Sequence, residues 1–583
     1  MSGRAVLGSA LAALAAAVAV ITVACGEKPE PADLILLGGK IVTLDPDRPE
    51  ARALAARAGQ IVAVGSDAEI ARFRGPSTEV IDLEGRLAIP GFIESHAHFL
   101  GLGQSLLNLD LRGARTWDEV VERIAGAASE TASGEWILGR GWHQEKWDSP
   151  PRPSVEGYPT HEALSRAAPD HPVVLAHASG HAVMVNARAL ALAGITGDTP
   201  DPPGGTILHD ESGEPTGLLR ETAEDLVGVV HATSLSNLAA DRVEAQRRRA
   251  AELAARECLT KGVTTFQDAG SDFPTVDLLR RMAEEGHPGP RLWMMLNEDN
   301  DALERSAAEY RQIGAASGRF TVRAVKRVLD GALGSHGAWL LEPYTDLPGT
   351  SGLNTYPLAE LERTARICAA RELQLCVHAI GDRANRETLD VYERVLADLP
   401  GGGSRRWRIE HAQHLDVADV PRFAQLGVIA SMQGIHCTSD GPWVPDRIGP
   451  DRARTGAYLW RSLLDAGVRI CNGTDAPVED VDPIASFHAT VTRGLADGTT
   501  FYPDQRLTRL EALRSYTLDA AYAAFEDGRL GSLVPGKLAD VVVLSQDILT
   551  VPDDAIRQAH VLYTIVGGEV LHRAATASGN GPT

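Results

Sequence analysis

The chain has 583 residues, and its 56 basic and 78 acidic side chains give a net charge of −22. So acidic a chain lacks the clustered cations that displace counterions from a nucleic-acid backbone, which argues against nucleic-acid binding. A content of 44% hydrophobic and 23% charged residues is that of a globular protein and excludes general disorder. Beyond the N-terminus no apolar run approaches about 18 residues, which excludes a polytopic membrane protein.

The first residues have the pattern of an export signal. A short basic start is followed by an apolar stretch up to Ala24, and Cys25 stands directly after small residues. We interpret residues 1–24 as a lipoprotein-type signal peptide, with Cys25 lipidated and residues 25–32 forming a tether. The usual leucine three positions before the cysteine is replaced by threonine, and an uncleaved anchor helix or a plain signal cut elsewhere are the alternatives. Each predicts an exported protein, and the lipoprotein reading predicts a cell-envelope location with only a lipid anchor in the membrane.

Short strands are predicted at both ends of the mature chain. From Asp33 onward, apolar and polar residues alternate between glycine turns, and a matching pattern returns from Gly531 onward. Neither end contains enough strands for a stable sheet of its own. We therefore predict that residues 33–87 and 528–575 combine into one small β-sandwich.

The segment between these ends has the pattern of a parallel sheet in an α/β fold, because strand-like apolar runs alternate with helical ones. Eight runs are predicted as strands: Ala88–Phe99, Gly262–Ala269, Arg291–Leu296, Arg323–Gly331, Leu373–Gly381, Arg406–Gln413, Val428–Gln433 and Arg469–Ala476. Eight is the number that closes a (β/α)8 TIM-like barrel, which we place over residues 88–527. The first gap, 262 − 99 = 163 positions, far exceeds the roughly 30 residues of a βαβ unit. Residues 104–258 are therefore predicted to be mostly an insertion or lid over the barrel mouth.

Five metal-binding side chains fall at the ends of these predicted strands. His96 and His98 close the first strand and, being two residues apart, face the same side. The fifth, sixth and eighth strands end in His378, His411 and Asp475. Carboxyl ends of the strands form the catalytic face of such a barrel. We predict a centre of one or two divalent ions, with zinc expected from these ligands and iron or manganese as alternatives.

Lys326 lies on the fourth predicted strand among apolar residues. Burial lowers the pKa of an ammonium group, and the neutral amine is nucleophilic. Such an amine can take up carbon dioxide as a carbamate, which would bridge two ions as a carboxylate does. The alternative is a buried ion pair between Lys326 and Asp330 without modification.

The chain resembles the amidohydrolase superfamily, and specifically amidohydrolase family 3, over nearly the whole mature sequence. The resemblance rests on eight motifs, at residues 90–99, 139–148, 330–338, 378–385, 409–414, 431–433, 473–479 and 531–540. It implies one metal held by His96, His98 and Asp475, a second held by His378 and His411, and Lys326 bridging them.

The sequence departs from the family pattern in expected substrate-contact loops. His143, His336 and Ala476 stand where the family often has Asp, Arg and Phe, which leaves the substrate open. Residues predicted to contact substrate are Trp142, His143, His181, His336 and His436, because pockets favour such side chains, although ordinary packing explains them as well. Glu410, beside His411, is expected to point away from the metals.

The family resemblance, together with this ligand set, implies hydrolysis of a carbon–nitrogen bond other than a peptide bond, in an amide or an N-substituted formamide. A divalent ion lowers the pKa of bound water toward about 7 and polarises the scissile carbonyl. Asp475 is the predicted catalytic residue, which takes the water proton and passes it to the leaving nitrogen; a purely structural ligand is the alternative. Other candidates are a deaminase or cyclic amidase on the same scaffold and a non-catalytic solute-binding lipoprotein. The expected partner is a small-molecule substrate, and a homo-oligomer stays open.

Overall fold

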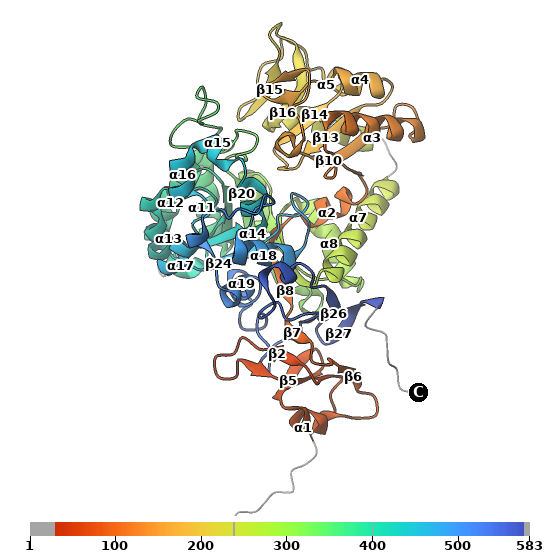
Figure 1. Cartoon of the computed structure of the whole chain (residues 1–583), viewed down its shortest axis with the longest axis vertical. Coiled ribbons are helices and arrows are strands. Elements are labelled where there is room, and N and C mark those ends of the chain that lie inside the picture. The colour runs from red at the N-terminus through yellow and green to blue at the C-terminus, as the bar shows by residue number, and fades with distance from the viewer. Residues whose placement is uncertain (1–28, 237–239, 400–401, 576–583) are drawn as a thin grey trace, which may run out of the picture.

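The computed structural model describes residues 29–236, 240–399 and 402–575 (Figure 1). The predicted signal peptide and the first half of the predicted tether, residues 25–28 with Cys25, lie outside these residues. Over the described part of the chain, no helix combines the length and the apolar character needed to cross a membrane.

A nearly closed barrel of eight parallel strands forms the centre of the molecule. Each strand pairs with the next along the chain. The last strand meets the first where the Asp475 amide donates to the His96 carbonyl at 2.7 Å. The predicted barrel is confirmed, with strands β8 (Phe92–Ala97), β17 (Val263–Ser271), β18 (Arg291–Leu296), β20 (Phe320–Val328), β21 (Gln374–Ala379), β22 (Arg408–His411), β23 (Ile429–Gln433) and β24 (Ile470–Gly473).

Helices cover the outside of the barrel and bury their apolar faces against the strands. In α12 (Asp382–Ala397), for example, Leu389, Val391 and Val395 are buried in the same core as strand residues. This pattern fits an amphipathic helix with one face toward a sheet. The other main covering helices are α7 (Ala240–Thr260), α8 (Phe273–Glu284), α9 (Asn300–Tyr310), α11 (Leu358–Arg371), α13 (Val420–Leu426), α17 (Trp460–Asp465), α18 (Pro483–Thr492), α19 (Arg509–Ser515) and α20 (Leu518–Ala523).

The first predicted strand, Ala88–Phe99, is in fact divided at Gly91. Residues before it form β7 (Leu87–Pro90), which belongs to a different sheet, and residues after it form β8 of the barrel. A Cβ atom on Gly91 would collide with the side chain of Thr264. Glycine therefore lets the chain pass from one sheet to the other in this narrow space.

Two sheets hold the segments from the two ends of the chain. One has the order β5-β4-β1-β6, with β1 (Leu34–Leu37), β4 (Ala53–Arg57), β5 (Gln60–Gly65) and β6 (Glu79–Asp82). The other has the order β27-β26-β25-β7-β2-β3, with β2 (Lys40–Val42), β3 (Glu50–Ala51), β25 (Val541–Leu544), β26 (Val561–Val566) and β27 (Glu569–Arg573). Leu36 and Ile81 of the first sheet share a buried cluster with Val543 and Ile565 of the second. Both ends of the chain thus build one core, at the lower end of Figure 1.

The chain between α2 (Phe99–Ser105) and α7 forms a separate layer at the opposite end, in orange and yellow in Figure 1. Its sheet has the order β15-β16-β14-β13-β10-β9. The predicted insertion included most of α7, but this helix buries Ala251, Ala254 and Cys258 in the core of the barrel. The elements of this layer are β9 (Leu109–Asp110), β10 (Ile137–Trp142), β13 (Val173–His177), β14 (Ala182–Val185), β15 (Gly205–His209), β16 (Pro215–Glu221), α3 (Trp117–Glu130), α4 (Glu162–Ala167), α5 (Ala187–Ala193) and α6 (Asp225–Ser236).

Candidate metal centre

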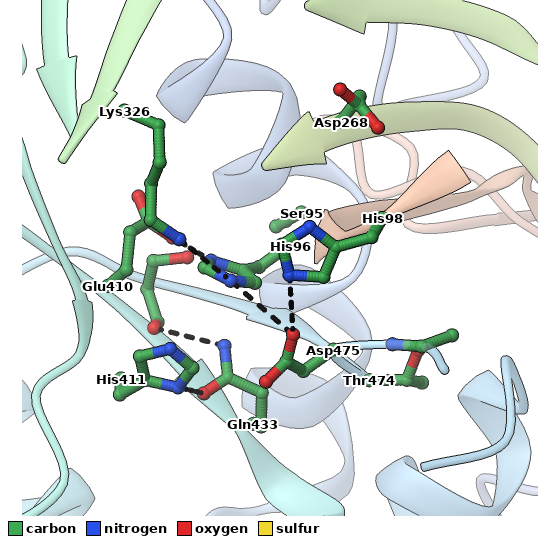
Figure 2. Close-up of polar contacts among 12 residues, drawn as sticks. Ser95, His96, His98, Asp268, Lys326, Glu410, His411, Gln433, Thr474 and Asp475 are labelled. Carbon is green, nitrogen blue, oxygen red and sulfur yellow. Dashed lines mark hydrogen bonds and ion pairs between the residues drawn. The ribbon is translucent and has the colours of Figure 1, made fainter. Parts of the chain in front are cut away.

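Three buried side chains converge at the carboxyl ends of the barrel strands. His96 lies in β8, His411 ends β22, and Asp475 follows β24 (Figure 2). One ligand atom from each lies within 4.8 Å of the other two. Two imidazoles and one carboxylate form a donor set that suits zinc and related divalent ions.

Unpaired polar atoms at this point support the fit of a metal ion. Asp475 Oδ1 and His378 Nε2 are buried and make no hydrogen bond with any described residue. Buried polar atoms in folded proteins almost always have a partner, so an unpaired carboxylate oxygen beside two imidazoles indicates a ligand site. The residues present therefore match the needs of a divalent cation.

Two further predicted ligands lie beside this group. His98 Nε2 is 3.3 Å from Asp475 Oδ1, and Lys326 Nζ is 3.3 Å from His96 Nε2. Burial lowers the pKa of Lys326. The alternative ion pair with Asp330 does not form, because the Asp330 carboxylate instead accepts hydrogen bonds from three backbone amides.

His378 is the sixth predicted ligand and lies on β21, next to His411. The centroids of these two rings are 4.4 Å apart. The sequence analysis assigned this pair to a second ion, yet the tightest group combines His411 with His96 and Asp475. The structure thus brings all six predicted ligands to one end of the barrel, and the assignment of each to a first or a second ion stays a prediction.

Left-handed backbone conformations direct two of the ligands. His411 has φ of 72° and Asp475 has φ of 59°, in a region that residues other than glycine rarely adopt. Such strain clusters at functional sites, where surrounding structure holds it in place. At His411 it breaks the alternation of the strand, so that Glu410 and His411 both face the barrel interior.

This geometry overturns the expectation for Glu410. Its side chain is fully buried inside the barrel, and it accepts a short hydrogen bond from His96 Nδ1. Burial alone would raise the pKa of Glu410, but the charge of Arg408 and the contact with His96 hold the pKa well below its usual range. Glu410 is therefore an ionised neighbour of a metal-ligand candidate and does not point outward.

A second buried carboxylate ties the two strand ends that close the barrel. Glu94 Oε1 accepts hydrogen bonds from the His96 amide at 3.1 Å and the Thr474 amide at 2.8 Å. Its other oxygen accepts the Thr474 hydroxyl at 2.8 Å. Burial raises the pKa of Glu94 to about 8. Because Thr474 precedes Asp475, this carboxylate fixes the backbone next to two of the three converging side chains.

Asp475 itself carries a negative charge in this setting. Burial alone would raise its pKa, but the close contact with His98 and the electrostatic influence of the His96 and His411 rings hold the pKa well below the usual range. On the opposite side, Gln433 Oε1 lies 2.7 Å from His411 Nδ1 and orients that ring. Gln433 was noted in the sequence only as part of a motif, without a role.

A small cavity of about 50 Å³ lies between the barrel and the inserted layer. Three of the five predicted substrate residues line it, His143 and His181 from the insertion and His436 from the barrel, together with His411 and Asp475. Residues of both layers therefore line one cavity at the candidate metal centre.

The other two predicted substrate residues do not line this cavity. Trp142 packs within the insertion, where its indole nitrogen donates to the Leu175 carbonyl at 2.8 Å and its ring stacks on Trp147. Trp142 is the last residue of β10, and the next residue, His143, is still extended, so the two side chains face opposite sides and only His143 reaches the cavity. His336 lies 3.2 Å from Asp346 in an adjoining loop.

Glu221 was missed by the sequence analysis. Its carboxylate accepts a 2.7 Å hydrogen bond from His181 Nδ1, and its backbone adopts φ 51° and ψ −130°. Burial alone would lower the pKa of His181, but Glu221 raises it to about 9. Glycines 331 and 337 of a barrel loop make room for this carboxylate, since a Cβ atom on either would collide with it. No local pattern in the sequence marks such a contact between distant segments.

Comparison with known proteins gives a consistent result. The model of a family described as the amidohydrolase family matches residues 79–572. LONG AFTER FAR-RED 3 of Arabidopsis thaliana is 35% identical over 93% of this chain and 92% of its own length. The N-substituted formamide deformylase of Arthrobacter pascens is 29% identical over 94% of this chain and 99% of its own length. An uncharacterized metal-dependent hydrolase of Pyrococcus horikoshii has a similar structure, with a TM-score of 0.71 and 27% identity over 89% of this chain and 99% of that one.

Proposed function

Because this chain belongs to the amidohydrolase family, we propose that it is a metal-dependent hydrolase that cleaves the carbon–nitrogen bond of a small amide or N-substituted formamide. The convergence of His96, His411 and Asp475 at the carboxyl ends of barrel strands carries this proposal. Similarity to an N-substituted formamide deformylase supports the bond type. The cavity of about 50 Å³ supports a small acyl group, such as formyl, beside the metal centre.

Zinc is the proposed ion, and His96, His411 and Asp475 would hold it. A second ion would be held by His98, His378 and Lys326, the last as a carbamate. When bound, a divalent ion lowers the pKa of water and polarises the substrate carbonyl. The protein supplies the path of the proton. Asp475 Oδ1 makes no well-formed hydrogen bond with the described residues, although the His98 and His96 rings lie beside it. It is therefore placed to accept the proton of the attacking water and return it to the leaving nitrogen.

Side chains around Asp475 orient these steps. His98 Nε2, at 3.3 Å from Asp475 Oδ1, fixes the orientation of the carboxylate. His181 and His436 line the cavity and present polar ring atoms to a substrate. The inserted layer supplies part of the cavity wall beside the centre, through residues such as His143 and His181.

The test compares zinc-loaded wild type with the Asp475→Asn variant on simple amides, N-substituted formamides, cyclic amides and aminopurines. The expected result is release of formate or another carboxylic acid by wild type and a loss of turnover of roughly 10²- to 10⁴-fold in Asp475→Asn. Asp451→Asn, at a carboxylate that is 91% exposed, serves as the matched control with wild-type turnover. Equal turnover in wild type and Asp475→Asn would refute the mechanism, and release of ammonia from aminopurines would assign a deaminase instead.

We also propose that the protein is exported and anchored through lipidated Cys25, on the basis of the N-terminal sequence. Labelling with a radioactive fatty acid in cells that express wild type or Cys25→Ala tests this. Label in wild type alone is expected. Equal label in the two proteins, or label in neither, would contradict the lipoprotein proposal.

A further inference from the structure

We propose that Glu410 is a positioning residue that fixes the ring of His96 so that its Nε2 atom is free to bind the metal, and that Arg408 holds Glu410 for this purpose. The inference rests on the proposed metal centre and extends it. Neither Glu410 nor Arg408 is itself a candidate metal ligand. Their role is carried by three contacts inside the barrel.

The first contact sets the tautomer of His96. An ionised carboxylate can only accept a hydrogen bond, so His96 Nδ1 must be the donor to Glu410 Oε2. In the neutral imidazole the other nitrogen, Nε2, then carries the lone pair. The Lys326 amine agrees with this, because it lies 3.3 Å from Nε2 and can donate to a lone pair there. Asp475 Oδ1, 3.6 Å from Nε2, is a second electron-pair donor on the same side, and a cation between the two would satisfy both. A histidine that binds a metal needs this arrangement.

The second contact is the bidentate ion pair between Arg408 and Glu410. The guanidinium donates from Nε to Oε1 at 2.6 Å and from Nη2 to Oε2 at 2.9 Å. Both side chains are fully buried. A bidentate pair of this kind fixes the plane of the carboxylate, and with it the direction from which His96 is held.

The third contact links the same arginine to the backbone of β8. Arg408 Nη2 donates to the Ser95 carbonyl at 2.7 Å, one residue before His96. It also lies 2.9 Å from the Ser431 hydroxyl on β23. Arg408 thus holds both the main chain and, through Glu410, the ring of His96.

Stability alone does not account for this arrangement. Buried ion pairs are often no more stabilising than well-packed apolar side chains of similar volume, because both charges lose their hydration. Here the carboxylate makes a third bond, to a ring whose other nitrogen faces the candidate metal centre. One strand end, β22, therefore supplies a ligand candidate in His411 and the support of a second one across the barrel.

The experiment measures zinc affinity of the full-length protein, after metal removal, by competition with a chromophoric chelator. Glu410→Gln removes the charge and is expected to weaken zinc binding by roughly 10- to 100-fold. Glu410→Asp keeps a counter-ion for Arg408 and shortens the reach to His96 by one methylene. We expect it to fold and to bind zinc about tenfold more weakly than wild type.

Asp540→Asn is the matched control. Asp540 forms a comparable buried bidentate pair with Arg291, at 2.8 and 3.0 Å, at the end of the barrel far from the ligands. Its loss should lower the thermal midpoint and leave zinc affinity within about twofold of wild type, since its partners contact none of the ligand candidates.

The outcomes separate the two proposals. Wild-type zinc affinity in Glu410→Asp overturns the positioning role, whether or not Glu410→Gln folds. An equal loss of affinity in Asp540→Asn also overturns it, because general loosening would then explain the effect. If the wild type hydrolyses amides and binds zinc, and the Glu410 variants bind zinc equally well, the positioning role is overturned and the proposed function is unaffected. Wild type that binds no zinc overturns both proposals.

Discussion

His414 is a neutral imidazole in the interior, and we predict that it makes the protein sensitive to acid. Its residue is 2% exposed, its ring packs edge-on against Tyr458, and its Nδ1 atom has no hydrogen-bond partner among the described residues. Burial lowers the pKa of His414 from 6.5 to about 3, and the charge of Arg452 acts in the same direction. The residue lies three positions after His411, so the loop it supports belongs to the candidate site.

The sign and size of the effect follow from this pKa. As the pH falls below 6.5, the imidazole takes up a proton in the unfolded chain, whereas in the folded protein it stays neutral until about pH 3. The unfolded state binds more protons across this window, so the free energy of unfolding falls with the pH. At pH 5 the loss amounts to about 2 kcal/mol, and below pH 3 it approaches about 5 kcal/mol.

Denaturant unfolding of wild type and His414→Gln at about pH 7.5 and pH 5 measures this contribution, because glutamine stays neutral throughout. Wild type should lose about 2 kcal/mol more than the variant between the two pH values. The same substitution at the exposed His560 should leave the pH dependence of wild type in place. If wild type and His414→Gln lose the same free energy, the imidazole does not remain neutral in the fold and the reasoning is refuted.

Three further outcomes are expected. Gly473→Ala should lower both the zinc content and the thermal midpoint, measured by metal analysis and calorimetry, because its Cβ atom would collide with the Glu94 carboxylate and lie 2.7 Å from the His96 amide. Chelation should lower the thermal midpoint and added zinc should restore it, since a ligand of the native state stabilises that state; an unchanged midpoint would count against the metal centre. Arg447→Met removes the ion pairs that join Arg447 to Glu145 of the insertion and Asp346 of the barrel, so limited proteolysis should cut the insertion faster than in wild type.

The barrel and the region of the site could be predicted because both depend on a repeating pattern. Apolar runs alternating with helical ones specify parallel strands, and the carboxyl ends of parallel strands meet on one face. Five imidazole and carboxylate side chains at such ends, with Lys326 on a strand between them, were therefore expected together. The break at Gly91 was missed because one apolar run serves two sheets, and a run alone does not show where its hydrogen-bond partners change.

The errors at Trp142 and Glu410 have different causes. Trp142 is the last residue of β10 and His143 directly follows it, so the rule that adjacent residues of an extended chain face opposite sides could have excluded one of them as a cavity residue. For Glu410 the same rule gave the wrong answer, because it assumes regular strand geometry up to His411. The left-handed conformation of His411 directs its side chain toward the interior without displacing Glu410. No residue type in the sequence indicates this conformation.

The contact between Glu221 and the barrel indicates what the barrel and the inserted layer each contribute to the candidate site. Glu221 belongs to the insertion and holds His181 at the cavity, yet its carboxylate fits only because glycines 331 and 337 leave space for it. The packing of the insertion against the barrel therefore also places His181 at the cavity. The metal-ligand candidates all come from the barrel, whereas part of the cavity wall comes from the insertion. Under the proposed function, changes in the inserted layer alter which substrate is accepted while the role proposed for Asp475 stays the same, as expected when binding residues lie on connections carried by a rigid scaffold.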